Sequence, residues 1–363
     1  MKFWTSNNIG QQPWIHSRKS DSIFILAPPF LALLLVLLFP KQFTNSPGLS
    51  PLFWLILVVF VDVAHVYSTL FRTYFNSENY RKNQSLYIAV PLTCYVTGVI
   101  LYDIDGLLFW RTLAYLAVFH FIRQQYGFMS LYSRKEPRNT LNYLIDTLTI
   151  YSATLYPIIY WHLTPGRNFN WFIEGDFFQL SSTTLIKPLF YIYLALLLVY
   201  FIKESLELKK HKAMNIPKNL LICGTAVSWF FGIVFFNGDM AFTTLNVISH
   251  GIPYMALIWL SEKKHINQGI PKAKKFTKYK FVYFLLIIVF FAYLEEGLWD
   301  GLIWNEHNQL FSIFSNLPKL QNSQVLTLVV PLLSLPQSTH YVLDGFIWKR
   351  KIQPSIGNLR RIT

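Results

Sequence analysis

The stretch FWLILVVFVDVAHVYSTLF, residues 53–71, combines a long apolar run with two ionisable side chains, Asp62 and His65. An apolar run of this length is typical of a helix that crosses the hydrocarbon core of a membrane. Residues three apart lie on one face of a helix, so Asp62 and His65 are expected side by side. Because ionisable groups are costly inside a membrane, such a pair indicates a functional site.

The whole composition places the chain in the membrane class. Hydrophobic residues make up 53% of the 363 and charged residues 14%, where soluble proteins carry roughly a quarter. The sequence predicts an all-α integral membrane protein, a polytopic bundle of about ten transmembrane helices. The ten expected segments are residues 23–40, 51–71, 86–102, 107–132, 143–162, 185–202, 219–237, 241–261, 281–298 and 324–348.

The distribution of Lys and Arg predicts the orientation of these segments. With both termini cytoplasmic, 27 of the 32 basic residues fall on the cytoplasmic side. We therefore expect a cytoplasmic tail at 1–22, one transmembrane domain at 23–348 and a basic cytoplasmic tail at 349–363. The net charge of +14 is interpreted as this topology signal beside anionic lipid, and not as nucleic-acid binding. The bacterial inner membrane is the expected location.

Four of the nine histidines lie inside apolar segments, at similar depth on four helices predicted to be parallel. These four are His65, His120, His250 and His340. Each has a polar neighbour three or four positions away, which places both on one helix face. The neighbours, in the same order, are Asp62, Gln124, Asn246 and Asp344.

This pattern predicts a metal site with the four histidines as ligands. A ligating imidazole needs its second nitrogen held by a carboxylate or amide, which is the role expected of the four polar neighbours. The alternative for each histidine is a hydrogen bond that joins two membrane helices. Imidazole ligands suit iron, zinc and copper. Non-haem iron with open coordination positions is the preferred interpretation, with haem and zinc as alternatives.

The four motifs resemble those of the Brp/Blh family of membrane-bound carotenoid dioxygenases. FHFIRQQYG, around His120, is similar to the second motif of that family, and PQSTHYVLDGFIW, around His340, is similar to the last. The first family motif reads P-H-G-x-x-D, where this chain has D-x-x-H, and its third usually carries a second histidine beside the one matched by His250. The resemblance implies a multi-helical membrane oxygenase with iron on histidines, acting on a carotenoid-like substrate.

Several other charged residues in or near the segments have separate interpretations. Arg123 is expected to pair with Asp62 or Asp344, or to meet a polar substrate group. Asp146 is expected to join the same network from the start of the fifth segment. Glu295 and Glu296 are interpreted as marking a helix end.

The leading hypothesis is therefore a membrane-embedded non-haem iron oxygenase that acts on a hydrophobic, lipid-soluble substrate. A proton-coupled transporter with His and Asp relays is the first alternative. A haem- or quinone-binding electron carrier is the second. The bilayer and a hydrophobic small molecule are the expected partners, with no nucleic acid and with any electron donor unidentified.

Overall fold

The computed structural model describes residues 12–43, 48, 50–136, 139–269 and 277–348. This part of the chain is helical and contains no strand. The predicted N-terminal tail is described only from residue 12. The predicted C-terminal tail, 349–363, lies outside the described residues.

The helices of the first half of the chain cover the first five predicted segments. Some are π-helical, with the wider hydrogen-bonding pattern of i to i+5. They are α1 (Arg18–Asp21), η2 (Ser22–Leu26), α2 (Pro28–Leu38), α3 (Pro40–Phe43), α4 (Pro51–Trp54), η3 (Leu55–Val63), α5 (Ala64–Arg72), α6 (Ser77–Ile104), α7 (Gly106–Tyr132) and α8 (Thr140–Leu163).

The second half continues in the same way, with one long loop before each of two helices. Its helices are α9 (Thr183–His211), α10 (Ile216–Trp229), η4 (Phe230–Phe235), α11 (Asp239–Gly269), α12 (Thr277–Trp299), η6 (Asp300–Trp304), α13 (Ser323–Leu333) and α14 (Leu335–Ile347). Asn residues cap several starts: the side chains of Asn76, Asn139 and Asn322 accept backbone N–H groups of α6, α8 and α13.

Every one of the ten predicted segments coincides with a helix or a bent pair of helices. Five helices are long and apolar enough to cross a membrane, and two bent pairs raise that number to as many as seven, within the described chain. Three long helices, α7, α8 and α11, are not among these candidate spans. Two of them carry histidines of the predicted site, His120 in α7 and His250 in α11. The helical membrane class is thus confirmed, whereas ten spans and the orientation of the termini stay predictions.

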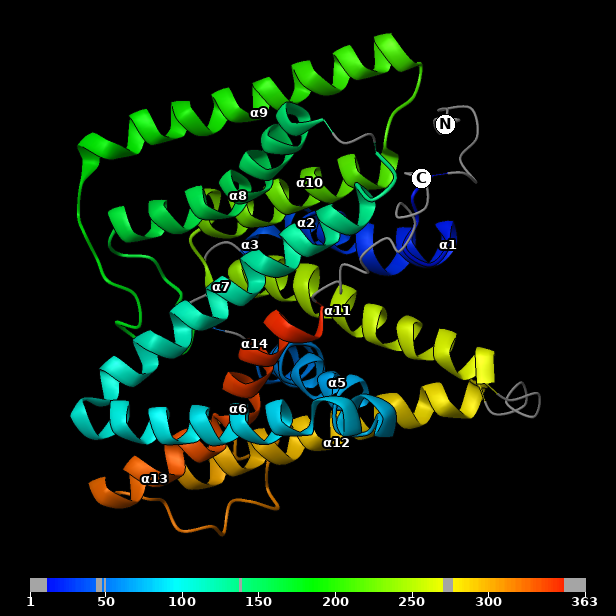
Figure 1. Ribbon diagram of the computed structural model, residues 1–363. Helices are drawn as coiled ribbons and strands as arrows, with labels where there is room; N and C mark the ends of the chain where they lie inside the picture. The colour runs from blue at the N-terminus through cyan, green and yellow to red at the C-terminus, as the bar shows by residue number, and fades with distance from the viewer. Residues whose placement is uncertain (1–11, 44–47, 49, 137–138, 270–276, 349–363) are drawn as a thin grey trace, which may run out of the picture.

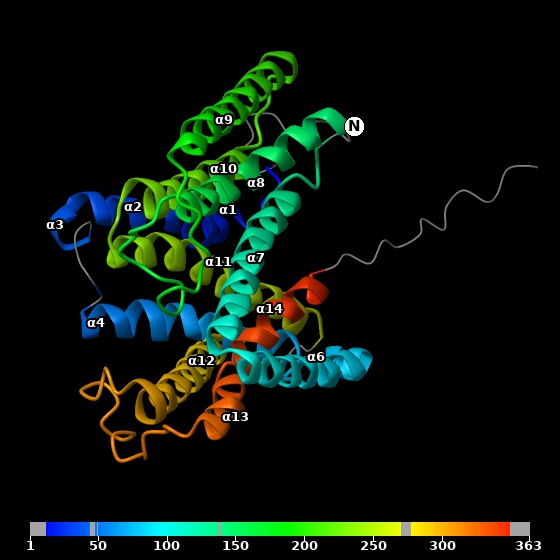
Figure 2. The same ribbon diagram turned by 90° about the vertical axis from the view of Figure 1, so that its left-hand side faces the viewer.

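The helices form two groups joined through α7 and α11. In both views α8, α9 and α10 lie together on one side, and α6, α12 and α13 lie on the other (Figures 1 and 2). Helix α11 packs on α2, η3 and α5, and α14 packs on α5, α6 and α7. The centre of the molecule is therefore built by α5, α7, α11 and α14.

Two irregularities in the helices precede two of the central histidines. The π-helical η3 ends at Val63, directly before the turn of α5 that carries His65. The pair α13 and α14 is bent by 42° at Ser334, between Pro331 and Pro336. Prolines break the intrahelical hydrogen bonding, which explains the bend. The bend directs α14 into the centre between α5 and α7.

Gly251, next to His250, permits a close approach between α11 and η3. A Cβ atom at this position would lie 3.0 Å from both Cγ1 and the carbonyl oxygen of Val61. Gly127, in α7, has no atom within 4 Å of its corresponding position. The absence of a side chain at Gly251 is thus what allows α11 to reach the segment that carries His65.

We predict that Gly251→Val destabilises the protein by about 1–3 kcal/mol, because the added methyl groups overpack this contact. The matched change Gly127→Val has open space and is expected to change stability by less than about 0.5 kcal/mol. Thermal unfolding midpoints of both variants in the same detergent test this. Equal midpoints would contradict the close approach.

Candidate metal centre

Four buried histidines meet at the centre of the bundle, one each from α5, α7, α11 and α14. Their exposed fractions are 1% or 2%. His250 Nε2 lies 3.1 Å from His65 Nε2, and His340 Nε2 lies 3.1 Å from His120 Nε2. The rings of His65 and His340 lie 5.0 Å apart, as do those of His120 and His250.

Three of the four form the tightest group. One ring nitrogen from each of His65, His120 and His340 lies within 4.8 Å of the other two. His250 does not belong to that set, although its Nε2 touches His65. Its ring stacks on Phe121, with centroids 3.4 Å apart and planes 8° from parallel. A buried histidine triad that could hold a metal ion is therefore present, with a fourth imidazole beside it.

The outer nitrogens of His120 and His340 have polar partners from neighbouring helices. His120 Nδ1 lies 3.3 Å from Asp344 Oδ2, and His340 Nδ1 lies 2.7 Å from Thr69 Oγ1. Tyr254 links these partners, because its hydroxyl lies 3.1 Å from Thr69 Oγ1 and donates to Asp344 Oδ1 at 2.8 Å. Such partners fix the tautomer and the direction of an imidazole.

The outer nitrogens of the other two histidines are less well supported. His65 Nδ1 lies 3.5 Å from Asp62 Oδ1, which is too long for a strong hydrogen bond. His250 Nδ1 is buried and has no hydrogen-bond partner among the described residues. Asp62 is the expected neighbour of His65, and its side chain is 37% exposed because it also borders a cavity.

The expected pairs at helical spacing differ from the observed ones at three positions. Asp344 contacts His120 of α7 and not His340 of its own helix. Gln124 donates to the backbone carbonyl of His250 and not to His120. Asn246 donates to the carbonyl of Phe242 in its own helix, at 2.9 Å. The Nδ1 atoms of His120 and His340 face neighbouring helices, so spacing along one helix does not select their partners.

The hydrogens of the contacts around His120 and His340 can be placed in two ways, of which only the first satisfies every contact. In the first, His340 donates its Nδ1 hydrogen to Thr69, and Thr69 donates its own to Tyr254. Tyr254 then donates to Asp344, which also accepts the Nδ1 hydrogen of His120. Both Nε2 lone pairs then face each other at 3.1 Å, which requires a cation between them. In the second, Thr69 donates to His340, and His340 Nε2–H donates to His120. Because Tyr254 still donates to Asp344, this arrangement leaves no hydrogen between Thr69 and Tyr254.

The spacing of the inner nitrogens fits shared coordination. Two nitrogens held at about 2.0–2.1 Å from one ion lie about 2.9 Å apart at a right angle and about 3.4 Å apart at a tetrahedral angle. The two observed separations of 3.1 Å fall between these values. The donor set is entirely imidazole, which suits iron, zinc or copper and not magnesium or calcium.

Arg123 and Asp146, both expected near this site, have other partners. Arg123 is exposed, and its guanidinium donates to the hydroxyl of Tyr151 at 2.7 Å and lies over the ring of Tyr126. Within the described part of the chain, Arg123 does not form the expected contact with Asp62 or Asp344.

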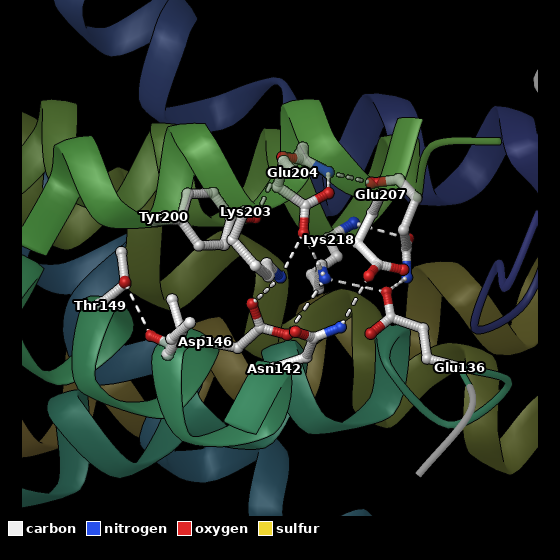
Figure 3. Close-up of polar contacts among 12 residues, drawn as sticks. Glu136, Asn142, Asp146, Thr149, Tyr200, Lys203, Glu204, Glu207 and Lys218 are labelled. Carbon is white, nitrogen blue, oxygen red and sulfur yellow. Dashed lines mark hydrogen bonds and ion pairs between the residues drawn. The ribbon is translucent and has the colours of Figure 1, made fainter. Parts of the chain in front are cut away.

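Asp146 belongs to a separate network of buried charges between α8, α9 and α10 (Figure 3). It pairs with Lys203, and its other oxygen lies 3.1 Å from Lys218 Nζ. Lys218 also lies 2.8 Å from Glu204 and 2.9 Å from Glu136. Burial raises the pKa of the Glu136 carboxyl, and Lys218 beside it opposes this. The charges compensate one another, so this network ties three helices together.

Sequence reasoning missed the residues that support the histidines from across the bundle. Thr69 lies at i+4 from His65, a helical spacing that could have identified it. Tyr254 and Trp348 lie at i+4 from His250 and from Asp344, and Trp348 Nε1 donates to Asp344 Oδ1 at 2.5 Å. Hydroxyl and indole groups are common in membrane helices, so their spacing alone carried little signal.

In the comparisons with known proteins, no family model matches the chain, and no curated protein or solved structure matches it. The site is therefore interpreted from its own geometry.

We predict that Thr69→Val weakens metal binding about 10–100-fold, because His340 loses the partner of its Nδ1 nitrogen. Thr149→Val is the matched control, since Thr149 is equally buried but donates only to the carbonyl of Ile145 in its own helix. Metal titration of both variants, after removal of bound metal, gives the affinities. Equal affinities would contradict a role for Thr69 in positioning His340.

Proposed function

We propose that this chain is a membrane-embedded oxygenase that holds non-haem iron on His65, His120 and His340, with His250 as a fourth ligand. The observation that carries the proposal is the convergence of four imidazoles on one buried point. When bound there, iron would supply activation of dioxygen for the oxidation of a hydrophobic, lipid-soluble substrate. The resemblance of the sequence motifs to carotenoid dioxygenases favours a carotenoid-like compound or another lipid.

The residues around the histidines have defined roles in this proposal. Asp344 and Thr69 hold the Nδ1 hydrogens of His120 and His340, which leaves the inner nitrogens free as ligands. Tyr254 closes the chain between them. The buried side chains Phe121 and Tyr341 cover the rings and exclude water. Positioning and a dry environment are what a protein supplies to such a centre.

The alternatives receive different support from the geometry. A bis-histidine haem places a porphyrin between two imidazoles, whereas here the rings of His120 lie 4.5 Å from His340 and 5.0 Å from His250. That crowding disfavours haem. Three histidines with an open position also suit zinc, which elemental analysis distinguishes from iron. A dioxygenase needs no external reductant, and a hydroxylase or desaturase would need an electron donor.

A proton-coupled transporter is the second candidate, and one observation favours it. The hydrogen-bonded chain from His340 through Thr69 and Tyr254 to Asp344 and His120 resembles a proton relay. In this case the histidines bind no metal, and their inner nitrogens hydrogen-bond to each other. The metal content of the purified protein separates the two candidates.

We predict about one iron per chain and no Soret band in protein purified without chelators. Changing His65, His120 or His340 to Ala removes the iron, because each supplies one of three ligands. His250→Ala is expected to lower the affinity for iron. His211→Ala is the control, because His211 is partly exposed and lies beside Glu207. Elemental analysis of each folded variant is the measurement. Stoichiometric iron in two of the triad variants would contradict the ligand assignment.

The proposal includes ten spans, with both termini on the cytoplasmic side of a bacterial inner membrane. The basic stretches at helix ends and the ten helical segments support this arrangement. In a chain freed of Cys94 and Cys223, we predict that Lys319→Cys reacts with an impermeant maleimide from the periplasmic side. Lys212→Cys reacts only after the membrane is opened. Labelling of both from the same side would contradict the topology.

A further inference from the structure

A large cavity lies beside the histidines, at the end of the bundle away from the basic loops. Its volume is about 840 Å³. It is bordered by η3, α7, the start of α11, the end of α12 and α14, and by residues 167–174 of the loop after α8. A cavity of this size is in the range of sites for small organic molecules.

The walls of the cavity are aromatic. Five of the eleven tryptophans of the chain border it. They come from α4, α7, the loop after α8, α12 and η6, so they surround the space from different elements. The tryptophans are Trp54, Trp110, Trp171, Trp299 and Trp304. Aromatic faces carry negative electrostatic potential and attract cations, with tryptophan the strongest of them.

The charged residues of the lining are acidic in a protein that is otherwise basic. Six carboxylates border the cavity, whereas Arg167 is the one Lys or Arg among its described lining residues. The Arg167 guanidinium is engaged with backbone, because it donates to the carbonyls of Ile233 and of Phe236. The six carboxylates are Asp62, Glu174, Asp239, Glu296, Asp300 and Glu306.

Glu296 is the most informative of these residues. It is 9% exposed, lies in α12 and borders the cavity, yet none of the described residues forms a hydrogen bond or ion pair with it. The residue before it, Glu295, does not border the cavity, and its oxygens accept from Tyr67 at 2.6 Å and Gln337 at 3.1 Å. A buried carboxylate without a partner is costly, so a ligand that supplies the partner would stabilise it.

Asp300, one turn further along, repeats this pattern. Its Oδ1 accepts the backbone N–H groups of Glu306 and His307, at 2.8 and 2.7 Å. Its Oδ2 is buried and has no partner among the described residues. Glu295 and Glu296, which were interpreted as marking a helix end, lie within the last two turns of α12, which ends at Trp299, and both are buried.

The cavity ends one side chain away from the histidines. Its lining includes Phe121, which stacks on His250, and Tyr341, whose ring lies 5.3 Å from that of His120. It also includes Asp62, beside His65. A molecule in the cavity is thus separated from the proposed metal centre by these three side chains.

We propose that this cavity binds an organic cation, a molecule with a protonated or quaternary amine on an apolar body. The ammonium group would face Glu296 and Asp300, and the apolar body would contact the tryptophans. A small metal ion fits less well, because the histidine triad is the one group of three possible ligands within 4.8 Å in the described chain. As a binding site beside the proposed metal centre, this inference goes beyond the proposed function and does not depend on it.

The test uses the full chain in nanodiscs at neutral pH and three probes with the same tail: octyltrimethylammonium, octyl sulfate and octyl glucoside. Tryptophan fluorescence reports binding, since five tryptophans border the cavity. We expect octyltrimethylammonium to bind about tenfold or more tightly than either other probe. Equal binding of all three probes would show a cavity that binds the apolar tail without a preference for charge. Absence of ammonium binding would show that protons neutralise the carboxylates. Either result overturns the proposal.

A pair of neighbouring substitutions locates the ammonium group. Glu296→Gln is expected to weaken octyltrimethylammonium binding about tenfold, because the unpartnered carboxylate becomes neutral. Glu295→Gln, one residue away but outside the cavity, is expected to leave it unchanged. Glu207→Gln, on the side of α9 that borders the other charged network, is a second control if Glu295→Gln does not fold. Unchanged binding in Glu296→Gln would overturn the assignment.

The metal content of the same samples separates this inference from the proposed function. Ammonium binding in a protein without iron would support the cavity site and contradict the oxygenase. Iron without ammonium binding would support the oxygenase and overturn the cavity site.

Discussion

The central constraint on this structure is the burial of four imidazoles with their inner nitrogens turned toward one another inside an apolar bundle. Polar groups in such surroundings must find partners, since lipid and apolar side chains offer none. Asp344 and Thr69 satisfy the outer nitrogens of His120 and His340, and Tyr254 links these two partners from a third helix. The inner nitrogens, 3.1 Å apart in two pairs, are satisfied either by a shared cation or by hydrogen bonds between them. The four imidazoles come from α5, α7, α11 and α14, so these helices meet at this point.

Three groups of buried ionisable residues differ in their chemistry. The histidine cluster is at the centre of the bundle. The network of Lys203, Lys218 and their carboxylates joins α8 to α9 and α10. The acidic cavity borders the start of α11. In the Lys network, positive and negative groups compensate one another, which is characteristic of a structural connection. In the cavity, Glu296 and the Oδ2 atom of Asp300 have no partner among the described residues. This contrast is why a ligand is inferred for the cavity and not for the network.

The sequence was sufficient to predict the helical membrane class and the meeting of the four histidines, because both depend on apolar length and on depth along parallel helices. It was not sufficient for the partners of those histidines. Asp344 was expected beside His340 but contacts His120, since rotation of each helix about its axis is decided by packing and not by spacing along one chain. The same limit applies to Arg123, which faces Tyr151, and to Asp146, whose lysine partners come from helices 57 and 72 residues away.

X-ray absorption at the iron edge of the purified protein tests the central claim most directly. The account predicts an iron signal with a first shell of nitrogen or oxygen neighbours at about 2.0–2.2 Å, imidazole scattering beyond it and no sulfur. Neither cysteine belongs to the group of possible ligands that the histidines form, so a sulfur neighbour has no source in the proposed site. Absence of a stoichiometric iron signal, or a first shell without imidazole scattering, would contradict the histidine metal centre.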